Sequence, residues 1–301
     1  MKNSYYLVNF KNILLFIVLV LFAACEKAEL NQNNENLDEY NEPNYPKKIG
    51  GRYLKSIFYK YRDYPSDLNF PFKSGVKVEF FYNSKNYVDY FKIYGFESVS
   101  TGRIVKIEYN ITGLVSRIKY FDTDSIIFSY ELFEYNKLKQ LSKISNYEFG
   151  IDKINYELTS YNEFNYSSMD TVVELRYIKF NNFGSPFRDI YMYDLDRNIK
   201  EKIAYSPNML YPYSSSEFYY NDKKRPFENL GLPIYEISYD YFQMSEILSK
   251  NHYIGSQGFS YDNNGLKTKF GDPQHFDIKY DNLNYPISRN ETIFYNYIDL
   301  N

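Results

Sequence analysis

The sequence predicts a mainly β protein: a signal peptide and a flexible tether, then a curved, twisted antiparallel sheet (an open half-barrel) of consecutive β-hairpin repeats. Three observations predict this fold. The 301 residues are 21% aromatic, with 37 Tyr, 25 Phe and no Trp, and Tyr and Phe favour strands. Apolar and polar residues alternate in many segments, as from Ile104 to Tyr109, which is the period of a half-buried strand. A short turn phrase recurs along the chain, and each copy predicts a hairpin.

Composition divides the chain into three parts. Lys2 and Lys11 precede the apolar run 13–22, and Ala23-Ala24-Cys25 follows it, which predicts a secretory signal peptide over residues 1–24. The run is shorter than the ~20 residues of an ordinary membrane-spanning helix. Residues 25–48 are polar and contain two prolines, so we expect a disordered tether. The hairpin domain then covers residues 49–301.

Cys25 is the only cysteine, so no internal disulfide can form. Its place after Leu21-Phe22-Ala23-Ala24 resembles a bacterial lipobox, which implies that Cys25 is the lipidated first residue of the mature protein. The following Glu26-Lys27-Ala28-Glu29 resembles the acidic export signal of Bacteroidetes surface lipoproteins. These resemblances imply a secreted protein, lipid-anchored to the bacterial outer membrane and exposed at the cell surface.

The turn phrase is an aromatic residue followed by Asn or Asp, a polar turn, and a return strand. Two copies carry Gly in the turn, Tyr109-Asn110 with Gly113 and Tyr261-Asp262 with Gly265. Three copies carry Pro six residues after the aromatic, namely Phe180 with Pro186, Tyr220-Asn221 with Pro226, and Tyr280-Asp281 with Pro286. The Asn or Asp can bond to the turn backbone, Gly accepts a positive φ, and Pro can open a return strand.

Further aromatic-Asn/Asp pairs begin at Tyr82, Tyr135, Tyr161 and Tyr193 and predict further turns. In each hairpin the aromatic lies in phase with the aliphatic positions of its strand, so we expect it to point inward. One stretch has a different period: Ile234, Ile237, Tyr241, Met244 and Leu248 are spaced as on a helix. We predict a short amphipathic helix near 234–250 that covers the sheet.

The phrase Tyr-Asp/Asn-x-x-Gly resembles the YD repeats of Rhs-type bacterial surface proteins. Tyr220 to Phe227 (YNDKKRPF) is more similar to the turns of Tyr-rich Bacteroidetes lipoproteins of unknown function, with Arg225 where those have Asn. The resemblance covers roughly residues 75–301. It implies a sheet of consecutive hairpins and brings no established activity.

Catalytic and metal signatures are absent from the sequence. His252 and His275 are expected to be solvated surface residues, and Asp194 to Asn198 is expected to be a hairpin turn, because Ile199 and Tyr205 occupy two essential positions of a calcium loop. Glu174, Asp189 and Glu217 are candidates for a glycosidase acid pair, but no spacing singles them out. We therefore expect no enzyme activity, no metal and no cofactor. The net charge of −3, with mixed signs along the chain, argues against a nucleic-acid partner.

Three hypotheses for function stay open. The first is a binding module for a glycan, a peptide or an envelope partner, with Tyr219, Tyr191 and Tyr193 as candidate stacking residues. The second is a structural scaffold whose tyrosines belong to the core, and the third is an enzyme such as a hydrolase. Asp124-Ser125-Ile126 and Asp170-Thr171-Val172 resemble the Bacteroidetes O-glycosylation triplet, which marks Ser125 and Thr171 as candidate glycan sites.

Overall fold

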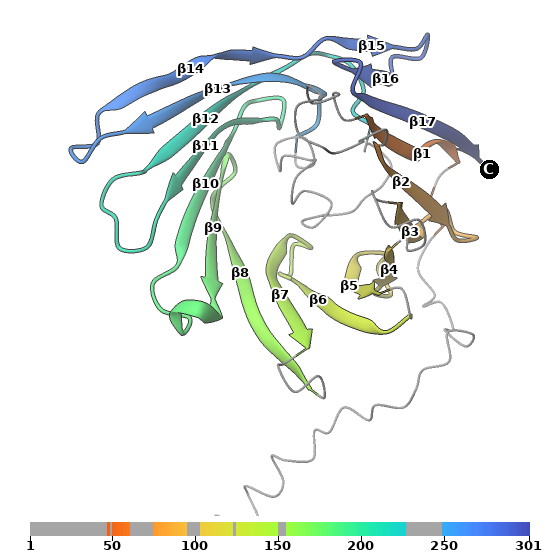
Figure 1. Ribbon diagram of the computed structural model, residues 1–301, viewed down its shortest axis with the longest axis horizontal. Coiled ribbons are helices and arrows are strands. Elements are labelled where there is room, and N and C mark those ends of the chain that lie inside the picture. Colours follow the sequence, from red (N-terminus) through yellow and green to blue (C-terminus); the bar gives the residue numbers. More distant parts are fainter. Residues whose placement is uncertain are drawn as a thin grey trace, which may run out of the picture. The chain divides into compact units, whose positions relative to one another are not determined.

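Figure 1 shows the computed structural model. It describes residues 47–48, 50–60, 75–94, 103–122, 125–149, 155–226 and 249–301. The predicted signal peptide, Cys25, most of the tether and residues 234–248 of the predicted helix lie outside the described residues, and the last two residues of the helix range, Ser249 and Lys250, are not helical. Within the described ranges, no helix is long and apolar enough to cross a membrane.

The predicted fold class is confirmed, because the described residues form one open antiparallel sheet of 17 strands with a single 3-10 turn. The elements are β1 Gly51–Lys60, β2 Gly75–Tyr82, β3 Val88–Tyr94, β4 Arg103–Tyr109, β5 Val115–Phe121, β6 Ile127–Tyr135, β7 Leu141–Phe149, β8 Tyr156–Ser168, β9 Thr171–Ile178, η1 Lys179–Asn181, β10 Phe187–Tyr193, β11 Ile199–Tyr205, β12 Ser214–Tyr220, β13 Tyr253–Tyr261, β14 Lys267–His275, β15 Ile278–Tyr280, β16 Pro286–Arg289 and β17 Ile293–Leu300.

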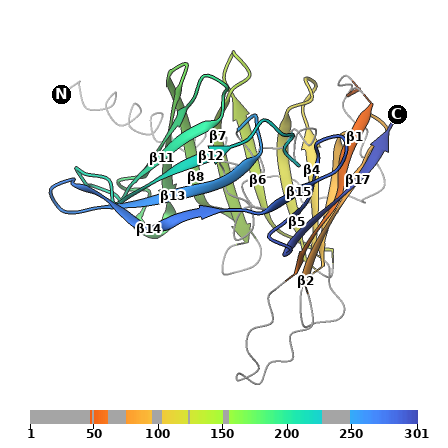
Figure 2. The same ribbon diagram turned by 90° about the horizontal axis from the view of Figure 1, so that it is seen from above.

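The ladders follow chain order. Each strand from β1 to β13 pairs with the next, and β15, β16 and β17 pair in the same way. The last strand, β17, returns to pair with β1, and the two lie side by side in both views (Figures 1 and 2). No ladder joins β14 to β15 within the described residues 249–301, and the sheet is open there.

Antiparallel order places alternate turns at the same end of the sheet. The start of β1, the end of β17 and the turns after β2, β4, β6, β8, β10 and β15 share one end, which we call the tether end because the chain enters it at Lys48. The amide of Lys48 donates to the carbonyl of Lys85 over 3.0 Å. The side chain of Asn86 donates to the carbonyls of Lys48 and Asn301, at 3.3 and 3.1 Å. The two ends of the described chain are therefore hydrogen-bonded to the turn between β2 and β3.

The core lies on one face of the sheet, as the period-2 pattern predicts. The larger buried cluster covers β1 to β7 and β17 and includes Leu54, Ile57, Phe91, Ile107, Ile118, Ile144 and Tyr295. A smaller cluster on β9 to β11 consists of Val172, Tyr191 and Ile199. Strand side chains alternate between faces, so the residues between these positions form the opposite face.

One predicted turn is wrong, at Tyr161, and one repeat aromatic, Phe180, does not point inward, although the chain does reverse between β9 and β10 around Phe180 and Pro186. Tyr161 lies within the long strand β8 rather than before a turn. Phe180 does not point inward: it is 99% exposed, at the centre of η1. The chain reverses there through two consecutive residues with positive φ, Asn182 and Phe183, and Phe183 rather than Phe180 packs on the sheet, against Tyr161.

Candidate functional site

Seven hairpin turns share one hydrogen-bond pattern, shown by Asn136. Its amide donates to the carbonyl of Gln140 and its carbonyl accepts from the amide of Lys139, both at 2.9 Å. Its Oδ1 accepts from the amides of Leu138 and Gln140, at 2.9 and 3.0 Å. The two backbone bonds, and the side-chain bond to the residue four positions on, recur at Asn83, Asn110, Asp122, Asp194, Asp262 and Asp281.

The fourth residue of each turn has a positive φ, between 61° and 81°: Asn86, Gly113, Ser125, Lys139, Arg197, Gly265 and Asn284. Gly is the least strained residue in this region, and Asn is the next most tolerant. The repeat phrase thus specifies a turn by its Asn or Asp, whether or not Gly follows. Asn221 forms the corresponding bond with the amide of Lys223 over 3.0 Å, and its turn then runs out of the described residues beyond Pro226.

Tyrosine hydroxyls bridge neighbouring strands at the tether end, where four ladders stop. The position of each bridge is fixed by the last residue pair of its ladder. The accepting carbonyl belongs to the residue two positions before that pair on the first strand, and the donating Tyr lies three positions after that pair on the second strand. The pairs are Tyr82 to Leu54 (2.5 Å), Tyr109 to Val88 (2.8 Å), Tyr166 to Leu141 (3.0 Å) and Tyr297 to Pro286 (2.8 Å). Burial raises the pKa of Tyr82, Tyr166 and Tyr297, so these hydroxyls stay protonated donors.

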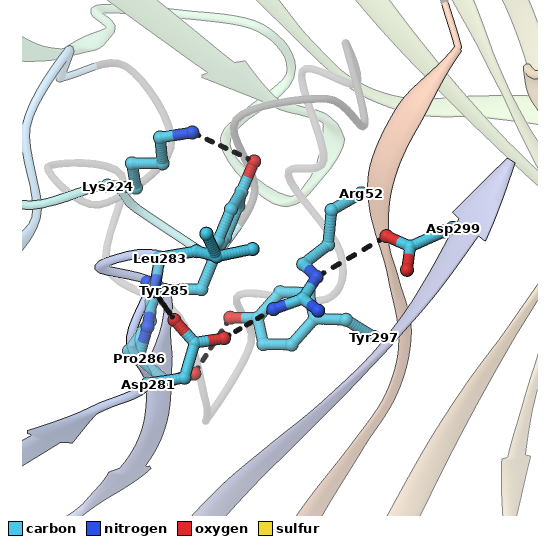
Figure 3. A network of polar contacts seen from close by, with 8 residues as sticks. All are labelled: Arg52, Lys224, Asp281, Leu283, Tyr285, Pro286, Tyr297 and Asp299. Atoms are coloured by element: carbon cyan, nitrogen blue, oxygen red, sulfur yellow. Dashed lines mark hydrogen bonds and ion pairs between the residues drawn. The ribbon is translucent and has the colours of Figure 1, made fainter.

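A polar network joins the first strand to the last hairpin (Figure 3). Arg52 Nη1 contacts Asp281 Oδ2 at 2.5 Å, and its Nε contacts Asp299 Oδ1 at 3.4 Å. The Tyr285 ring lies near the Arg52 guanidinium, 5.7 Å from it, and near Lys224 Nζ, 4.5 Å from it. Asp281 also accepts a hydrogen bond from the amide of Tyr285 within its own turn. The network therefore connects the hairpin of β15 and β16 to β1.

The acid candidates Glu174 and Asp189 are brought together, directly opposite each other on β9 and β10. Glu174 is buried and accepts from the side chains of Asn162 and Tyr191, both at 2.7 Å. Asp189 pairs with Lys202 at 2.8 Å. Burial and then the Glu174 charge raise the pKa of Tyr191 well above its ordinary value. Both carboxylates already have partners, so the arrangement is a structural network.

The third acid candidate lies on the other face. Glu217 shares Lys267 with Glu201, at 3.0 and 2.8 Å from Lys267 Nζ. No group of three or more His, Cys, Asp or Glu side chains that could hold a metal is found among the residues that the structure describes.

The expectation of two solvated histidines is wrong for one of them. His275 is exposed, but His252 is 1% exposed between β12, β13 and β15. His252 Nδ1 lies 3.0 Å from the Tyr280 hydroxyl, while Nε2 has no hydrogen-bond partner among the residues that the structure describes. Burial, with a smaller contribution from Arg289, lowers the pKa of His252 from 6.5 to about 3. The imidazole is therefore neutral across the physiological range.

The three candidate stacking tyrosines do not converge on one surface. Tyr191 is 2% exposed in the smaller cluster, and Tyr193 packs against the same cluster. Tyr219 lies on the other face, where its ring stacks on His275 at 5.6 Å. The candidate stacking residues are therefore divided between the two faces of the sheet, because the alternation of side chains puts Tyr219 on the face opposite to Tyr191.

A different aromatic surface lies on β6 to β9, on the face opposite to the core. We call it the tyrosine band: Tyr130, Tyr147, Phe149, Tyr156, Tyr161, Tyr177 and Phe183, all half-buried. Three pairs are direct cross-strand partners with nearly parallel rings: Tyr130–Tyr147 at 4.8 Å, Phe149–Tyr156 at 4.4 Å and Tyr161–Tyr177 at 4.5 Å. None of the seven rings belongs to either buried cluster of the described residues.

Charges and strain accompany the band. Lys143 Nζ lies 4.7 Å from the Tyr161 ring centre, and Arg117 lies 5.7 Å from that of Tyr130. Phe183 has φ of +54°, an unusual conformation for a bulky residue, and its ring lies 5.6 Å from that of Tyr161. Such strain costs on the order of 1–3 kcal/mol and persists where the surroundings enforce it, often at ligand sites. Sequence reasoning missed the band. The alternation within each strand indicated which aromatics share a face of that strand, but not which of them lie opposite each other on neighbouring strands.

The candidate glycan sites differ in exposure. Ser125 is exposed in the turn that follows β5, with φ of +63°. Thr171 is half-buried at the start of β9, and its hydroxyl donates to Asp170 Oδ1 over 3.2 Å.

Comparisons with known proteins give no family. No family model and no curated protein matches the chain. A porin-like protein from Bacteroides uniformis aligns over 85% of this chain and 99% of its own, with a TM-score of 0.41 and 9% identity. The complex TcdB2-TccC3-Cdc42 aligns over 69% of this chain, with a TM-score of 0.17 and 10% identity, and the chain spans only 13% of that structure's chain. Neither alignment is close enough to define a fold family.

Proposed function

We propose that this chain is a cell-envelope lipoprotein, anchored through Cys25, whose hairpin sheet is a non-catalytic module that binds a glycan at the tyrosine band. The lipobox-like end of the signal sequence supports the anchor. The tyrosine band supports the binding module, and it is the observation that carries the proposal.

The seven half-exposed rings of the band lie outside both core clusters of the described residues. Each aromatic side chain presents ~150–250 Å² of area, so the exposed part of the band is on the order of a few hundred Å². Contiguous exposed apolar patches of that size often mark binding sites. The strands beneath the band are held by consecutive ladders, so the rings are preorganised before a ligand arrives.

The polarity of the band favours a glycan. A sugar presents apolar C–H faces and a rim of hydroxyls, and a Tyr side chain offers an apolar ring with a polar tip. Lys143 and Glu163, paired across β7 and β8, add a donor and an acceptor beside the Tyr161 ring. An aliphatic peptide would leave these charged groups without hydrogen-bond partners.

The test is a glycan array probed with the full mature chain, followed by calorimetric titration of each ligand found. Tyr161→Ala removes the ring that contacts Tyr177, Phe183 and Lys143, and we expect it to weaken binding about tenfold, equivalent to about 1.4 kcal/mol. Tyr94→Ala is the matched control, because Tyr94 is 40% exposed on β3, outside the band, and should bind as the parent chain does. Equal affinity of Tyr161→Ala and the parent would exclude the band as the site.

The second candidate is a scaffold without a ligand, and the tyrosine bridges favour it. Four Tyr hydroxyls join neighbouring strands, so part of the tyrosine content has a structural use. A glycan array without any binding partner, on a chain whose folding is verified by its thermal transition, would support this candidate over the binding module.

A further inference from the structure

Exposed aliphatic side chains lie at the tips of five turns at the tether end. They are Ile111, Leu138, Met169, Leu195 and Leu283, exposed by 74%, 78%, 91%, 103% and 51%. Each belongs to a different turn, after β4, β6, β8, β10 and β15. Successive turns at one end are two strands apart, roughly 10 Å, so the first four tips form a row along the sheet end.

The turn geometry does not require an apolar tip. The turn 83–87 has the same hydrogen bonds as the others and carries Ser84 and Lys85 between Asn83 and Asn86. The turn can form with polar residues at these positions. The repeated exposed aliphatic side chains therefore indicate that this surface contacts an apolar environment.

Residues of both charges lie beside these tips: Asp194 and Asp196 flank Leu195 and Asp170 follows Met169, but basic residues are more numerous at this end. Leu138 stands between Lys137 and Lys139, and Arg197 follows Leu195 in its turn. Arg197 also donates to the carbonyl of Met169 over 2.5 Å, which ties two tips together. Other basic residues at this end are Lys47, Lys48, Lys85, Lys223, Lys224 and Lys250.

The opposite end of the sheet also exposes apolar residues, including Ile126, Phe180, Leu210 and Leu266. Acidic residues lie at both ends, Asp122, Asp262 and Glu291 here and Asp170, Asp194 and Asp196 at the tether end, but the described turns of this end carry fewer basic residues, with Lys179 among them. The tether end differs in a second way: the chain coming from Cys25 enters the sheet there, at Lys48.

We propose that the tether end docks on the lipid surface that holds the anchor, with the aliphatic tips in the headgroup region and the lysines on anionic lipid headgroups. This inference rests on the proposed lipid anchor. A single lipid chain gives marginal binding, and a second, polybasic or apolar contact makes the attachment stable. Basic side chains beside an anionic membrane add to that attraction, and salt weakens it.

The test places a single fluorophore on the acylated full-length mature chain in vesicles of phosphatidylethanolamine and phosphatidylglycerol. Acylation consumes Cys25, the only native thiol, so an introduced cysteine is the only labelling site. Leu138→Cys labels the tether end, and Leu210→Cys labels the opposite end at nearly the same exposure, 78% against 79%. Spin-labelled lipid should quench most of the fluorescence at Leu138→Cys and little at Leu210→Cys. Lys137→Glu with Lys139→Glu should reduce the quenching in these vesicles.

Equal quenching at the two positions, or stronger quenching at Leu210→Cys, would overturn the proposal. Intact mass tests the anchor separately. If the intact mass shows no acyl group, the proposed anchor is wrong. The same comparison of labelled positions is then made with the Cys25→Ser chain and phosphatidylglycerol vesicles. Quenching at Leu138→Cys alone would still support the docking surface, and no quenching would overturn it.

Discussion

The buried His252 should make the fold sensitive to moderate acid. The pKa of His252 is about 3 in the folded chain and 6.5 in the unfolded chain. Between these two pH values the unfolded chain therefore binds a proton at His252 that the folded chain does not bind. Stability contributed by the neutral imidazole is therefore complete above pH ~6.5 and is lost as the pH falls toward about 3. Between pH 7.5 and 5 the loss works out to about 2 kcal/mol, from about 1.36 kcal/mol per pKa unit.

The assay is urea denaturation of the parent chain and of His252→Asn at both pH values. Asn keeps a polar atom near the Tyr280 hydroxyl and does not titrate. We expect the parent to lose about 2 kcal/mol more than the variant on acidification, because every other group titrates in both chains. His275→Asn, which removes the only other histidine, should behave as the parent does. A difference between parent and His252→Asn below ~0.5 kcal/mol would refute the reasoning.

Three further predictions concern folding stability. Asn136→Ala removes all three side-chain hydrogen bonds that Asn136 makes in its turn and should cost about 1–2 kcal/mol by urea denaturation. Gly113→Ala should cost at least ~1 kcal/mol, because φ is +77° and the new Cβ would collide with a tyrosine hydroxyl, whereas Gly51→Ala meets nothing within 4 Å and should be near neutral by thermal denaturation. Glu174→Ala should cost about 2–4 kcal/mol by removing a shared acceptor, and Glu174→Gln, which keeps one acceptor oxygen, should cost clearly less in the same assay.

The hairpin architecture could be predicted because its signals are local. An Asn or Asp side chain bonds to its own turn, and alternation within one strand shows which side chains share a face. The phrase at Phe180 is similar to the other copies in sequence only: β9 already ends at Ile178, and the chain then reverses through η1 and through Asn182 and Phe183, which both have positive φ. Tyr161 misled because an aromatic-Asn pair is also an ordinary pair of strand residues.

The candidate sites could be predicted only in part, since they depend on register between strands. The tyrosine band needs Tyr130 opposite Tyr147 and Tyr161 opposite Tyr177, and no single strand contains that information. The burial of His252 likewise depends on where β12, β13 and β15 meet, which its polar sequence neighbours do not indicate.

The tyrosine bridges explain why tyrosine occupies four strand positions at the tether end: Tyr82 and Tyr109, which are aromatics of the repeat, and Tyr166 and Tyr297, which are not. Hairpins that diverge beyond their shared ladder leave a carbonyl without a backbone donor, and an unpaired buried carbonyl costs about 1–3 kcal/mol. A phenol three residues past the last ladder pair reaches that carbonyl across the gap, as Tyr109 reaches Val88. Where β11 and β12 diverge, Ser249 stands between Ile199 and Tyr220: its hydroxyl accepts from the Ile199 amide and donates to the Tyr220 hydroxyl. Phe would fill the same space and leave the acceptor without a donor, so part of the tyrosine content has this structural cause, in addition to any ligand that the tyrosine band binds.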